Sequence, residues 1–493
     1  MTEPDRNSTT ALRERYGARY RWLLLLTVMT GAIASIMSST IINVAIPDMS
    51  RYFTLNQSRA QWVSSGFMVA MTVSMLTTPW TLARYGYQRT FSGAMLLLMA
   101  GGIVGGLSNI YSLVLLGRVA EGLAAGVLQP IPAIIIMRAF EPSEQGRASG
   151  IFGMGAVLAP AVGPSVGGLL VDWFGWRSIF FMVVPFCLLA LVLARRFVPS
   201  TAPGGTAVNQ SGARLDGVGL LLGGGGTLCL LNGLVELHGG TLMPAAALLS
   251  AALLSLFLFL WWQRRRATAG LEPLMDLNLF AYRQFAMGTV VSFIYGIALF
   301  GSTYLLPVYM LMALKLSPVH VGTVMLPAGI VLALTIPLAG RLADRRPTWL
   351  LVSIGLLLLC LSFALMSTIG LLSTLWLLAG FSVLGRIGLG FILPSLNLGA
   401  MRGLPLALVT QGSSTIGFVR MLGGAAGVSL CAIVLEWRLA AHGDALARAT
   451  TSIARVAAFH EVFLLLAGVC ALALVAALRL RESGDAAPTR TQS

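Results

Sequence analysis

Two charged residues lie inside a long apolar run, where they could exchange a proton. Arg118 and Glu121 are three residues apart within the apolar segment 110–137, a spacing that puts them on one helix face, where they can form an ion pair. A charge at mid-bilayer costs about 2.5–3.5 kcal/mol, so such residues face a partner or a cavity. Burial penalises the carboxylate and Arg118 stabilises it. We therefore predict that Glu121 binds a proton beside Arg118; the alternative is a static ion pair.

Motifs for other chemistry are missing or out of context. No Gly-Lys dipeptide occurs, which excludes a P-loop lysine, and the four histidines form no HExxH motif. One GxSxG match, 163–167, lies inside an apolar run without the strand that a nucleophile elbow needs. The five cysteines fall in apolar runs without a CxxC motif. We predict no enzyme activity, no cofactor and no metal site.

Several polar or amphipathic side chains interrupt otherwise apolar runs. Such groups tend to face the interior of a membrane protein and to fix the orientation of a ligand in an apolar pocket. Hydrogen bonding between helices explains each of them equally well. The candidate substrate-cavity residues are Asn43, Gln129, Tyr295, Tyr304, Asn397 and Gln411.

The elements that must position these residues are membrane-spanning helices. The chain has 493 residues, of which 57% are hydrophobic and 10% are charged, a composition that excludes an ordinary soluble domain. Apolar runs of about 20 residues without alternation predict helices rather than barrel strands. Fourteen runs are expected at 22–46, 60–82, 91–108, 110–137, 147–171, 177–198, 217–235, 242–262, 285–311, 321–340, 348–368, 372–400, 409–435 and 457–480.

The distribution of basic residues predicts the orientation of these spans. Of the 33 Lys and Arg residues, 23 fall on the side of the N-terminus and 7 on the other side, which places both termini in the cytoplasm. The net charge of +15 therefore does not indicate nucleic acid binding, and no basic run exceeds 264–266. The long first apolar run predicts a permanent helix rather than a cleaved signal peptide.

The two halves of the chain repeat each other once the two central helices are set aside. Leu116-Gly117-Arg118 recurs as Leu384-Gly385-Arg386, 268 residues later. Repeats of this kind build transporters whose site lies between the halves near mid-membrane. The expected organisation is an N-tail at 1–21, a six-helix half at 22–198, a linker with two extra helices at 199–284, a second six-helix half at 285–480 and a C-tail at 481–493.

Three motifs carry a family resemblance. Pro160 precedes a Gly163-Pro164-Ser165-Val166-Gly167-Gly168 run, in which the prolines predict a bent helix and the glycines a smooth packing groove. The segment 40–47, Thr-Ile-Ile-Asn-Val-Ala-Ile-Pro, and Arg118 with Gly122 are the others. The sequence resembles the major facilitator superfamily, specifically its fourteen-span drug:H⁺ antiporter branch (EmrB/QacA-like). The antiporter motif of that branch corresponds to Pro160, Gly163, Pro164, Gly167 and Gly168.

The sequence departs from the family pattern at two acidic positions. Ser38 stands where the first-helix motif usually has Asp, and Ala83 stands where the loop after the second helix usually has Asp. The C-terminal copy of that loop is intact, so Asp344 with Arg341 and Arg345 is expected to hold the halves together. The gating-loop residues that the resemblance implies are Arg84, Gly86, Arg89, Gly340, Asp344 and Arg345.

The resemblance implies an all-α polytopic protein of the cell inner (plasma) membrane with the major facilitator fold. It implies proton-coupled efflux of amphipathic small molecules, including antibiotics, by alternating access. A weakly coupled or uncoupled transporter or importer is the first alternative, and a non-transporting scaffold or lipid-modifying enzyme is the second. The expected partners are a small-molecule substrate, protons and the bilayer, with a periplasmic adaptor protein as a further candidate.

Overall fold

The computed structural model describes residues 9–200, 215–238, 241–371, 373–444 and 452–480, and these residues form helices and connecting turns without strands. The N-terminal half contains α1 (Thr9–Tyr16), α2 (Tyr20–Tyr52), α3 (Gln57–Met75), α4 (Thr78–Leu107), α5 (Tyr111–Leu128), α6 (Ile131–Ala139), α7 (Gln145–Phe174) and α8 (Ser178–Phe197). The linker contains α9 (Gly217–His238) and α10 (Leu242–Thr268). The C-terminal half contains α11 (Arg283–Val308), α12 (Pro318–Ala343), α13 (Thr348–Met366), α14 (Leu375–Met401), α15 (Val409–Ala441) and α16 (Ile453–Leu478). Three short pieces complete the set: the 3-10 helices η1 (Gly17–Arg19) and η2 (Leu277–Ala281) and the π-helix η3 (Tyr309–Ala313).

Thirteen helical segments among the described residues are long and apolar enough to cross a membrane. The predicted span at 60–82 is not one of these because it is divided between α3 and the first turns of α4. Inside α4, Gly86 has a φ of 78°, and this residue turns the chain from that span into the next one. Only glycine adopts this conformation at no steric cost. The architecture therefore fits the fourteen predicted helices.

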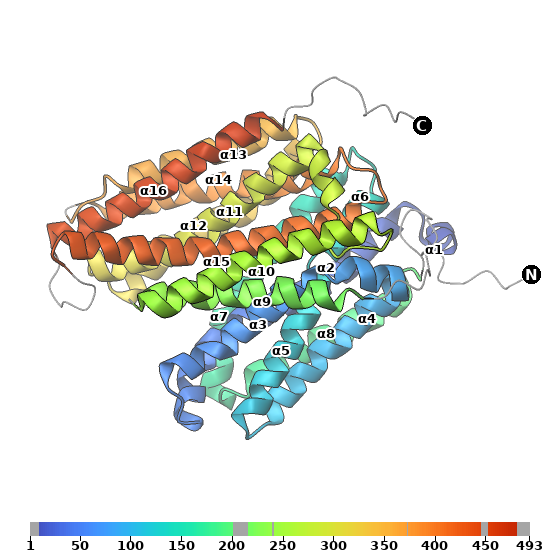
Figure 1. Cartoon of the computed structure of the whole chain (residues 1–493), viewed down its shortest axis with the longest axis horizontal. Helices are drawn as coiled ribbons and strands as arrows, with labels where there is room; N and C mark the ends of the chain where they lie inside the picture. The colour runs from blue at the N-terminus through green and yellow to red at the C-terminus, as the bar shows by residue number, and fades with distance from the viewer. Residues whose placement is uncertain (1–8, 201–214, 239–240, 372, 445–451, 481–493) are drawn as a thin grey trace, which may run out of the picture.

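The two halves form two bundles that lie at an angle to each other (Figure 1). The bundles converge at the end that carries α1 and α6 and diverge towards the opposite end. We name these the terminal end and the distal end. Leu480, just after α16, lies against Gly288 near the start of α11, so the last helix also finishes at the terminal end.

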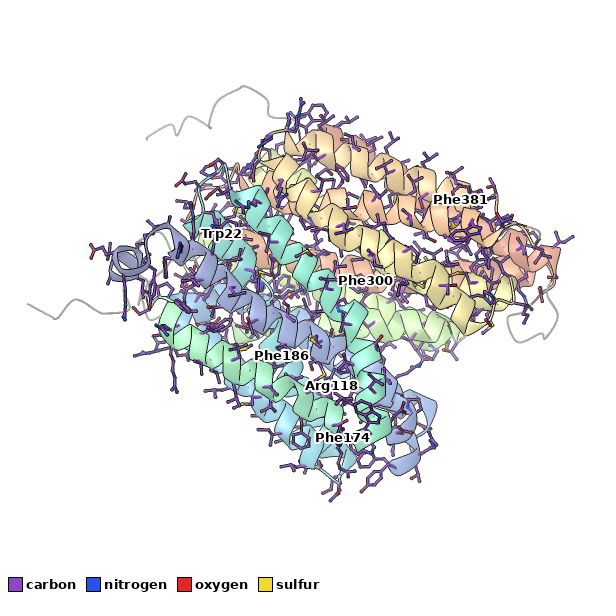
Figure 2. All side chains as sticks on the ribbon, turned by 180° about the vertical axis from the view of Figure 1, so that it is seen from behind. Trp22, Arg118, Phe174, Phe186, Phe300 and Phe381 are labelled. Carbon is purple, nitrogen blue, oxygen red and sulfur yellow. The ribbon has the colours of Figure 1, made fainter. Side chains whose placement is uncertain are left out.

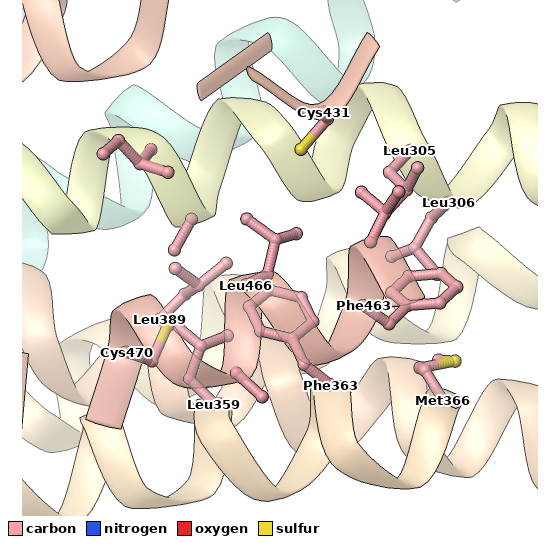
Figure 3. Packing of buried hydrophobic residues seen from close by; sticks show 14 of the residues in the cluster. Leu305, Leu306, Leu359, Phe363, Met366, Leu389, Cys431, Phe463, Leu466 and Cys470 are labelled. Atoms are coloured by element: carbon pink, nitrogen blue, oxygen red, sulfur yellow. The ribbon is translucent and has the colours of Figure 1, made fainter. Parts of the chain in front are cut away.

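The C-terminal half has the larger apolar core. Figure 3 shows Phe363 of α13 and Phe463 of α16 packed among leucines of α11, α13, α14 and α16. Cys431 and Cys470 belong to this core, as the sequence predicts for small apolar side chains. The five cysteines are free in the structure.

The central hairpin of α9 and α10 joins the two halves on one side of the molecule. Leu76 at the end of α3, Phe259 of α10 and Phe418 of α15 meet in one apolar cluster. Asp216 anchors the hairpin, since its Oδ1 accepts hydrogen bonds from Gly219 N and Trp262 Nε1, both at 2.9 Å. The extra helices are therefore packed against both halves.

Candidate functional site

The N-terminal bundle buries an ion pair between Arg118 and Glu121, which leave 1% and 0% of their surfaces exposed. Arg118 Nη1 donates to Glu121 Oε2 at 2.5 Å and to Ser38 Oγ of α2 at 2.9 Å. Arg118 Nε donates to the carbonyl of Val63 in α3 at 3.2 Å. Figure 2 shows Arg118 inside this bundle, far from Phe381 of the other half. The pair therefore links three helices of one half.

Glycines on α4 make room for the glutamate. A Cβ on Gly101 would lie 2.7 Å from Glu121 Cγ, and a Cβ on Gly102 would lie 3.3 Å from Glu121 Oε1. The same Cβ on Gly102 would lie 2.8 Å from the carbonyl oxygen of Phe180 in α8. Any larger residue at either position would push α5 or α8 away. The close packing keeps the carboxyl group between α4, α5 and α8.

The pair keeps unused hydrogen-bonding capacity. Within the described part of the chain, Glu121 Oε1 and Arg118 Nη2 have no hydrogen-bond partner. The guanidinium group also lies over the Phe67 ring, with Cζ 4.4 Å from its centroid. Buried unsatisfied polar atoms are uncommon and costly, and here they belong to the one charged pair that the sequence singled out. An oxygen without a partner leaves room for a proton on Glu121.

Ser38 belongs to this site, although the sequence analysis noted it only as a missing acid. Its hydroxyl is 1% exposed and accepts a hydrogen bond from Arg118. Position 38 therefore faces the arginine, and an aspartate there would also face it. The acid that pairs with Arg118 comes instead from α5, three residues along the same helix. The departure from the family pattern at position 38 is the one feature of the sequence that could have pointed to this residue.

The C-terminal half buries two arginines without an acidic partner among the described residues. Arg420 Nη1 donates to Asn397 Oδ1 at 3.5 Å. Arg386 is 9% exposed, and its side chain makes no hydrogen bond or ion pair within the described ranges. Tyr295 is 3% exposed and lies near both cations. Two of the candidate substrate residues, Tyr295 and Asn397, are thus brought together around Arg420.

The other candidate substrate residues are not assembled with this group. Asn43 accepts a hydrogen bond from Ser64 at 2.9 Å within the N-terminal half. Gln411 donates to the Pro273 carbonyl at 3.1 Å, which ties its amide to the linker. Gln129 caps α5, and Tyr304 is partly buried in α11. Their roles as substrate contacts stay predictions.

One contact between the halves is a glycine seam between α7 and α12, which we define by Gly146 and Gly150 on α7 and Gly340 on α12. A Cβ on Gly340 would lie 2.7 Å from Gly150 Cα, and a Cβ on Gly150 would lie 2.9 Å from Pro337 Cα. The backbones therefore touch directly near the terminal end. Small residues four apart are the general means for such an approach. Gly146 and Gly150 are not among the residues that the sequence motifs predict for this contact, although their spacing of four residues is visible in the sequence.

The predicted antiporter motif occupies the later part of α7 and packs within its own half. A Cβ on Gly163 would lie 2.9 Å from Thr40 Oγ1, and Gly167 faces Ile41. Thr40 and Ile41 belong to α2. Gly168 has open space beside it, and Pro160 is partly buried. The side chain of Pro164 lies outside the described residues, and α7 runs through both prolines as one helix. The groove thus sets the position of α2 against α7.

Asp344 holds the seam by capping a helix of the other half. Its Oδ1 accepts from Gly146 N at 2.6 Å, and its Oδ2 accepts from Arg147 N at 2.8 Å. These amides belong to the first turn of α7, where the helix's own N-cap residue, Glu144, makes no side-chain capping hydrogen bond. A carboxylate at this place satisfies orphan donors and meets the positive end of the helix dipole. Burial raises the pKa of Asp344, and the amide bonds and Arg402 oppose that shift.

The expectation that Arg341 and Arg345 complete this contact is wrong. Both are exposed, and their side chains form no hydrogen bond or ion pair with the described residues, whereas Arg402 Nη2 lies 3.9 Å from Asp344 Oδ1. The carboxylate points across the seam to backbone amides, so arginines on its own loop stay in solvent. In the N-terminal copy of the loop, Arg84 and Arg89 are likewise exposed, with Ala83 where the acid would be.

Comparisons with known proteins agree with this architecture. The family model described as Major Facilitator Superfamily matches residues 28–428. A multidrug resistance protein B homolog of Mycobacterium tuberculosis is 29% identical over 84% of this chain and 77% of its own length. The riboflavin transporter RibZ of Clostridioides difficile is 26% identical over 83% of this chain and 87% of its own. The crystal structure of the human organic anion transporter MFSD10 (TETRAN) has a TM-score of 0.65 at 16% identity, covering 93% of this chain and 99% of that one.

Proposed function

This chain belongs to the Major Facilitator Superfamily, and we propose that it is a proton-coupled efflux transporter of amphipathic small molecules. It is a multi-pass membrane transporter rather than an enzyme. The observation that carries the proposal is the buried Arg118–Glu121 pair with an unpartnered carboxylate oxygen. The name of the M. tuberculosis relative supports drugs as the substrate class.

The proposed orientation puts the terminal end in the cytoplasm, as the basic residues predict. The described contacts between the halves then close the cytoplasmic side, through the glycine seam and Asp344. The divergence of the bundles towards the distal end fits an outward-facing state (Figure 1). Alternating access would open the seam and bring the distal ends together.

In the proposed coupling step, Glu121 Oε1 accepts a proton from the outer side. Protonation removes the negative charge that holds Arg118, while the guanidinium group keeps its positive charge. Arg118 is then held by Ser38, the Val63 carbonyl and the Phe67 ring alone. Because Arg118 is then bound less tightly, protonation favours a rearrangement of α2, α3 and α5. We propose that this rearrangement alternates with substrate binding. Return of the proton to the cytoplasm restores the pair.

The test is uptake of a fluorescent amphipathic dye into everted membrane vesicles with an imposed pH gradient. We expect Glu121→Gln, which cannot titrate, to abolish gradient-driven uptake while exchange of dye without a gradient persists. Asp48→Asn, which removes an exposed ion pair with Arg51, is the matched control and should retain activity. Unchanged gradient-driven uptake by Glu121→Gln would remove Glu121 from the mechanism.

Uncoupled transport of a small organic solute is the second candidate. The serine at position 38 favours it, because the first helix contributes no acid to the site. The riboflavin transporter among the relatives shows that the comparisons are not confined to drug pumps. An uncoupler that leaves transport by the wild-type chain unaffected would favour this candidate.

The periplasmic adaptor rests on the family resemblance alone. A drug-susceptibility panel on cells with and without the gene, in the presence and absence of candidate adaptors, would test both the substrate class and this partner.

A further inference from the structure

Three side chains from different helices of the C-terminal half meet around a cation that has no acidic partner. Arg420 of α15 donates from Nη1 to Asn397 Oδ1 of α14 at 3.5 Å. Tyr295 of α11 is 3% exposed and lies near both Arg420 and Arg386. Neither arginine forms an ion pair with the described residues. We name Tyr295, Asn397 and Arg420 the Arg420 cluster.

The Arg420 cluster lies deep within the bundle. Arg420 is eleven residues after Val409, where α15 begins, and Tyr295 is twelve residues after Arg283, where α11 begins. An α-helix rises about 1.5 Å per residue, so both residues lie roughly 16–18 Å from the terminal end of their helices. A cation at such a depth in a bilayer is costly, and it therefore faces a partner or a cavity.

Arg420 lies on the face of α15 that is turned towards the N-terminal half. On this helix, Ser413 Oγ donates to the carbonyl of Pro130 at 3.0 Å, and Ile416 shares an apolar cluster with Met137 of α6. Arg420 is four residues after Ile416 and seven after Ser413, so the three lie on one helix face. At Arg420 this face has passed beyond those contacts towards the distal end, where the bundles diverge, and the arginine is partly exposed.

Asn397 is turned towards the N-terminal half by α14. A Cβ on Gly153 of α7 would lie 3.8 Å from Leu393 Cδ2, so this face of α14 lies near the other half. Asn397 follows Leu393 by one turn on that face and is partly exposed. Neither Asn397 Nδ2 nor the Tyr295 hydroxyl forms a hydrogen bond with the described residues. Both donors are therefore available to a ligand that binds between the halves.

Glycines hold α11 and α15 together beside this cluster. A Cβ on Gly296, the neighbour of Tyr295, would lie 2.9 Å from Gly424 N, and a Cβ on Gly424 would lie 2.6 Å from Phe300 Cδ2. The two helices therefore touch within one turn of Arg420. Such packing fixes the helices that carry the guanidinium and hydroxyl groups, which lowers the cost of ordering these groups around a ligand.

We propose that the transported substrate is an amphipathic organic anion whose carboxylate group binds at the Arg420 cluster. This inference rests on the proposed function and adds the charge of the substrate. The carboxylate accepts hydrogen bonds from Arg420, Asn397 Nδ2 and the Tyr295 hydroxyl, and a planar guanidinium group can donate two of them in parallel. Arg386 lies on the same face of α14 as Asn397, three turns closer to the distal end, and adds to the positive potential.

The test compares three probes that share one pyrene body and differ in the charge of the end group. They are the anion pyrenebutyrate, the neutral pyrenebutanol and the cation pyrenebutyltrimethylammonium. Equilibrium binding to the purified full chain is measured at neutral pH in neutral detergent, without a pH gradient. The variants are Arg420→Gln, Arg420→Lys and Tyr295→Phe. Arg264→Gln, at an exposed position near the end of α10, is the control for general positive charge.

We expect the wild-type chain to bind pyrenebutyrate about tenfold more tightly than pyrenebutanol, and the cationic probe more weakly than either, as for hydrogen bonds to charged groups. Arg420→Gln should weaken pyrenebutyrate binding about tenfold or more and leave pyrenebutanol binding unchanged, which also shows that the variant is folded. Arg420→Lys should keep part of the preference for the anion, and Tyr295→Phe should weaken anion binding about threefold. Arg264→Gln should bind like the wild type.

Three results would overturn the proposal: equal affinity of the wild-type chain for the three probes, absence of pyrenebutyrate binding, or a preference for the anion that survives Arg420→Gln. If Arg420→Gln binds none of the probes, Arg420→Lys and Tyr295→Phe decide in its place. Wild-type affinity for the anion in both of these variants would then overturn the proposal.

Failure of the proposed function would give a different result. If a pH gradient drives uptake of the cationic probe into everted vesicles but not of pyrenebutyrate, the proposed function stands and the anionic substrate is refuted. If the gradient drives no uptake while pyrenebutyrate binds with the expected pattern, the proposed function fails and the anion site stands.

Discussion

Each half of the molecule buries an arginine at a matching position of the repeat, but their surroundings differ. Arg118 has a carboxylate at 2.5 Å and a serine from the first helix. Arg386 lies near Tyr295 and has no acidic partner among the described residues. One copy of the repeat therefore places a titratable carboxyl group beside its buried arginine, and the other copy places none there among the described residues.

The loop between the second and third helices also differs between the halves, but here the C-terminal copy is the one that carries the carboxylate. In the C-terminal copy, Asp344 caps α7 across the seam. In the N-terminal copy, Ala83 offers no acceptor, and Leu408 gives α15 no side-chain cap. The carboxyl group that pairs with a buried arginine thus lies in the N-terminal half, and the carboxylate that caps a helix of the other half lies in the C-terminal half. A duplicated fold does not need the same residues twice, because each interface is made by residues of both copies.

The largest expected effect is the difference in protein stability between substitutions of the two buried arginines. Arg118→Gln leaves Glu121 buried without its cation and should destabilise the protein by about 3–5 kcal/mol. Arg386→Gln breaks no ion pair and should cost much less. Thermal unfolding in detergent measures both, and the double variant Arg118→Gln with Glu121→Gln should recover part of the loss. Equal losses for Arg118→Gln and Arg386→Gln would refute the difference between the halves.

The glycine seam gives the next largest effect. Gly340→Val places carbon atoms against the backbone of Gly150 and should cost about 1–3 kcal/mol as overpacking. The terminal ends then cannot converge, so crosslinking between cysteines placed on α7 and α12 should fall steeply. Gly329→Val on the same helix has open space beside it and is the matched control. A seam that still crosslinks fully in Gly340→Val would contradict the close approach.

The cap across the seam should have a smaller effect. Asp344→Ala leaves two amides of the first turn of α7 without a partner, at a cost of about 0.5–2 kcal/mol. The same crosslinking assay should show a moderate decrease. Asp344→Asn keeps an acceptor oxygen and should lie between Asp344→Ala and the wild type. If asparagine behaves like alanine, the charge rather than the hydrogen bonds is responsible.

The smallest effect is expected from a substitution that makes the two loops alike. Ala83→Asp puts a carboxylate at the position that matches Asp344 in the repeat, and we expect it to reach the start of α15, which has no side-chain cap. Favourable placement of an anion at a helix N-terminus is worth about 0.3–1 kcal/mol. We expect a small rise in unfolding temperature and a slightly higher fraction of this conformation. Lower stability would show that the N-terminal loop does not reach α15.

Much of the fold follows from local composition. Apolar runs such as 348–368 and 457–480 must be helices in lipid, because no other structure satisfies their backbone groups there, and α13 and α16 occupy them. The bounds of the span at 60–82 were harder to predict, because the break between α3 and α4 depends on packing rather than on hydropathy. The spacing of Arg118 and Glu121 likewise predicted their pairing, which depends only on helix geometry.

By itself, the sequence determined the helices, the repeat and the pairing of neighbours along one helix, because each depends on residues close together in the chain. Only the tertiary structure decided that Ser38 completes the arginine site, that Gly146 and Gly150 form the seam, and that Asp344 reaches backbone amides instead of Arg341 and Arg345. These contacts join segments more than fifty residues apart. Their geometry depends on how the bundles dock, which no local pattern encodes.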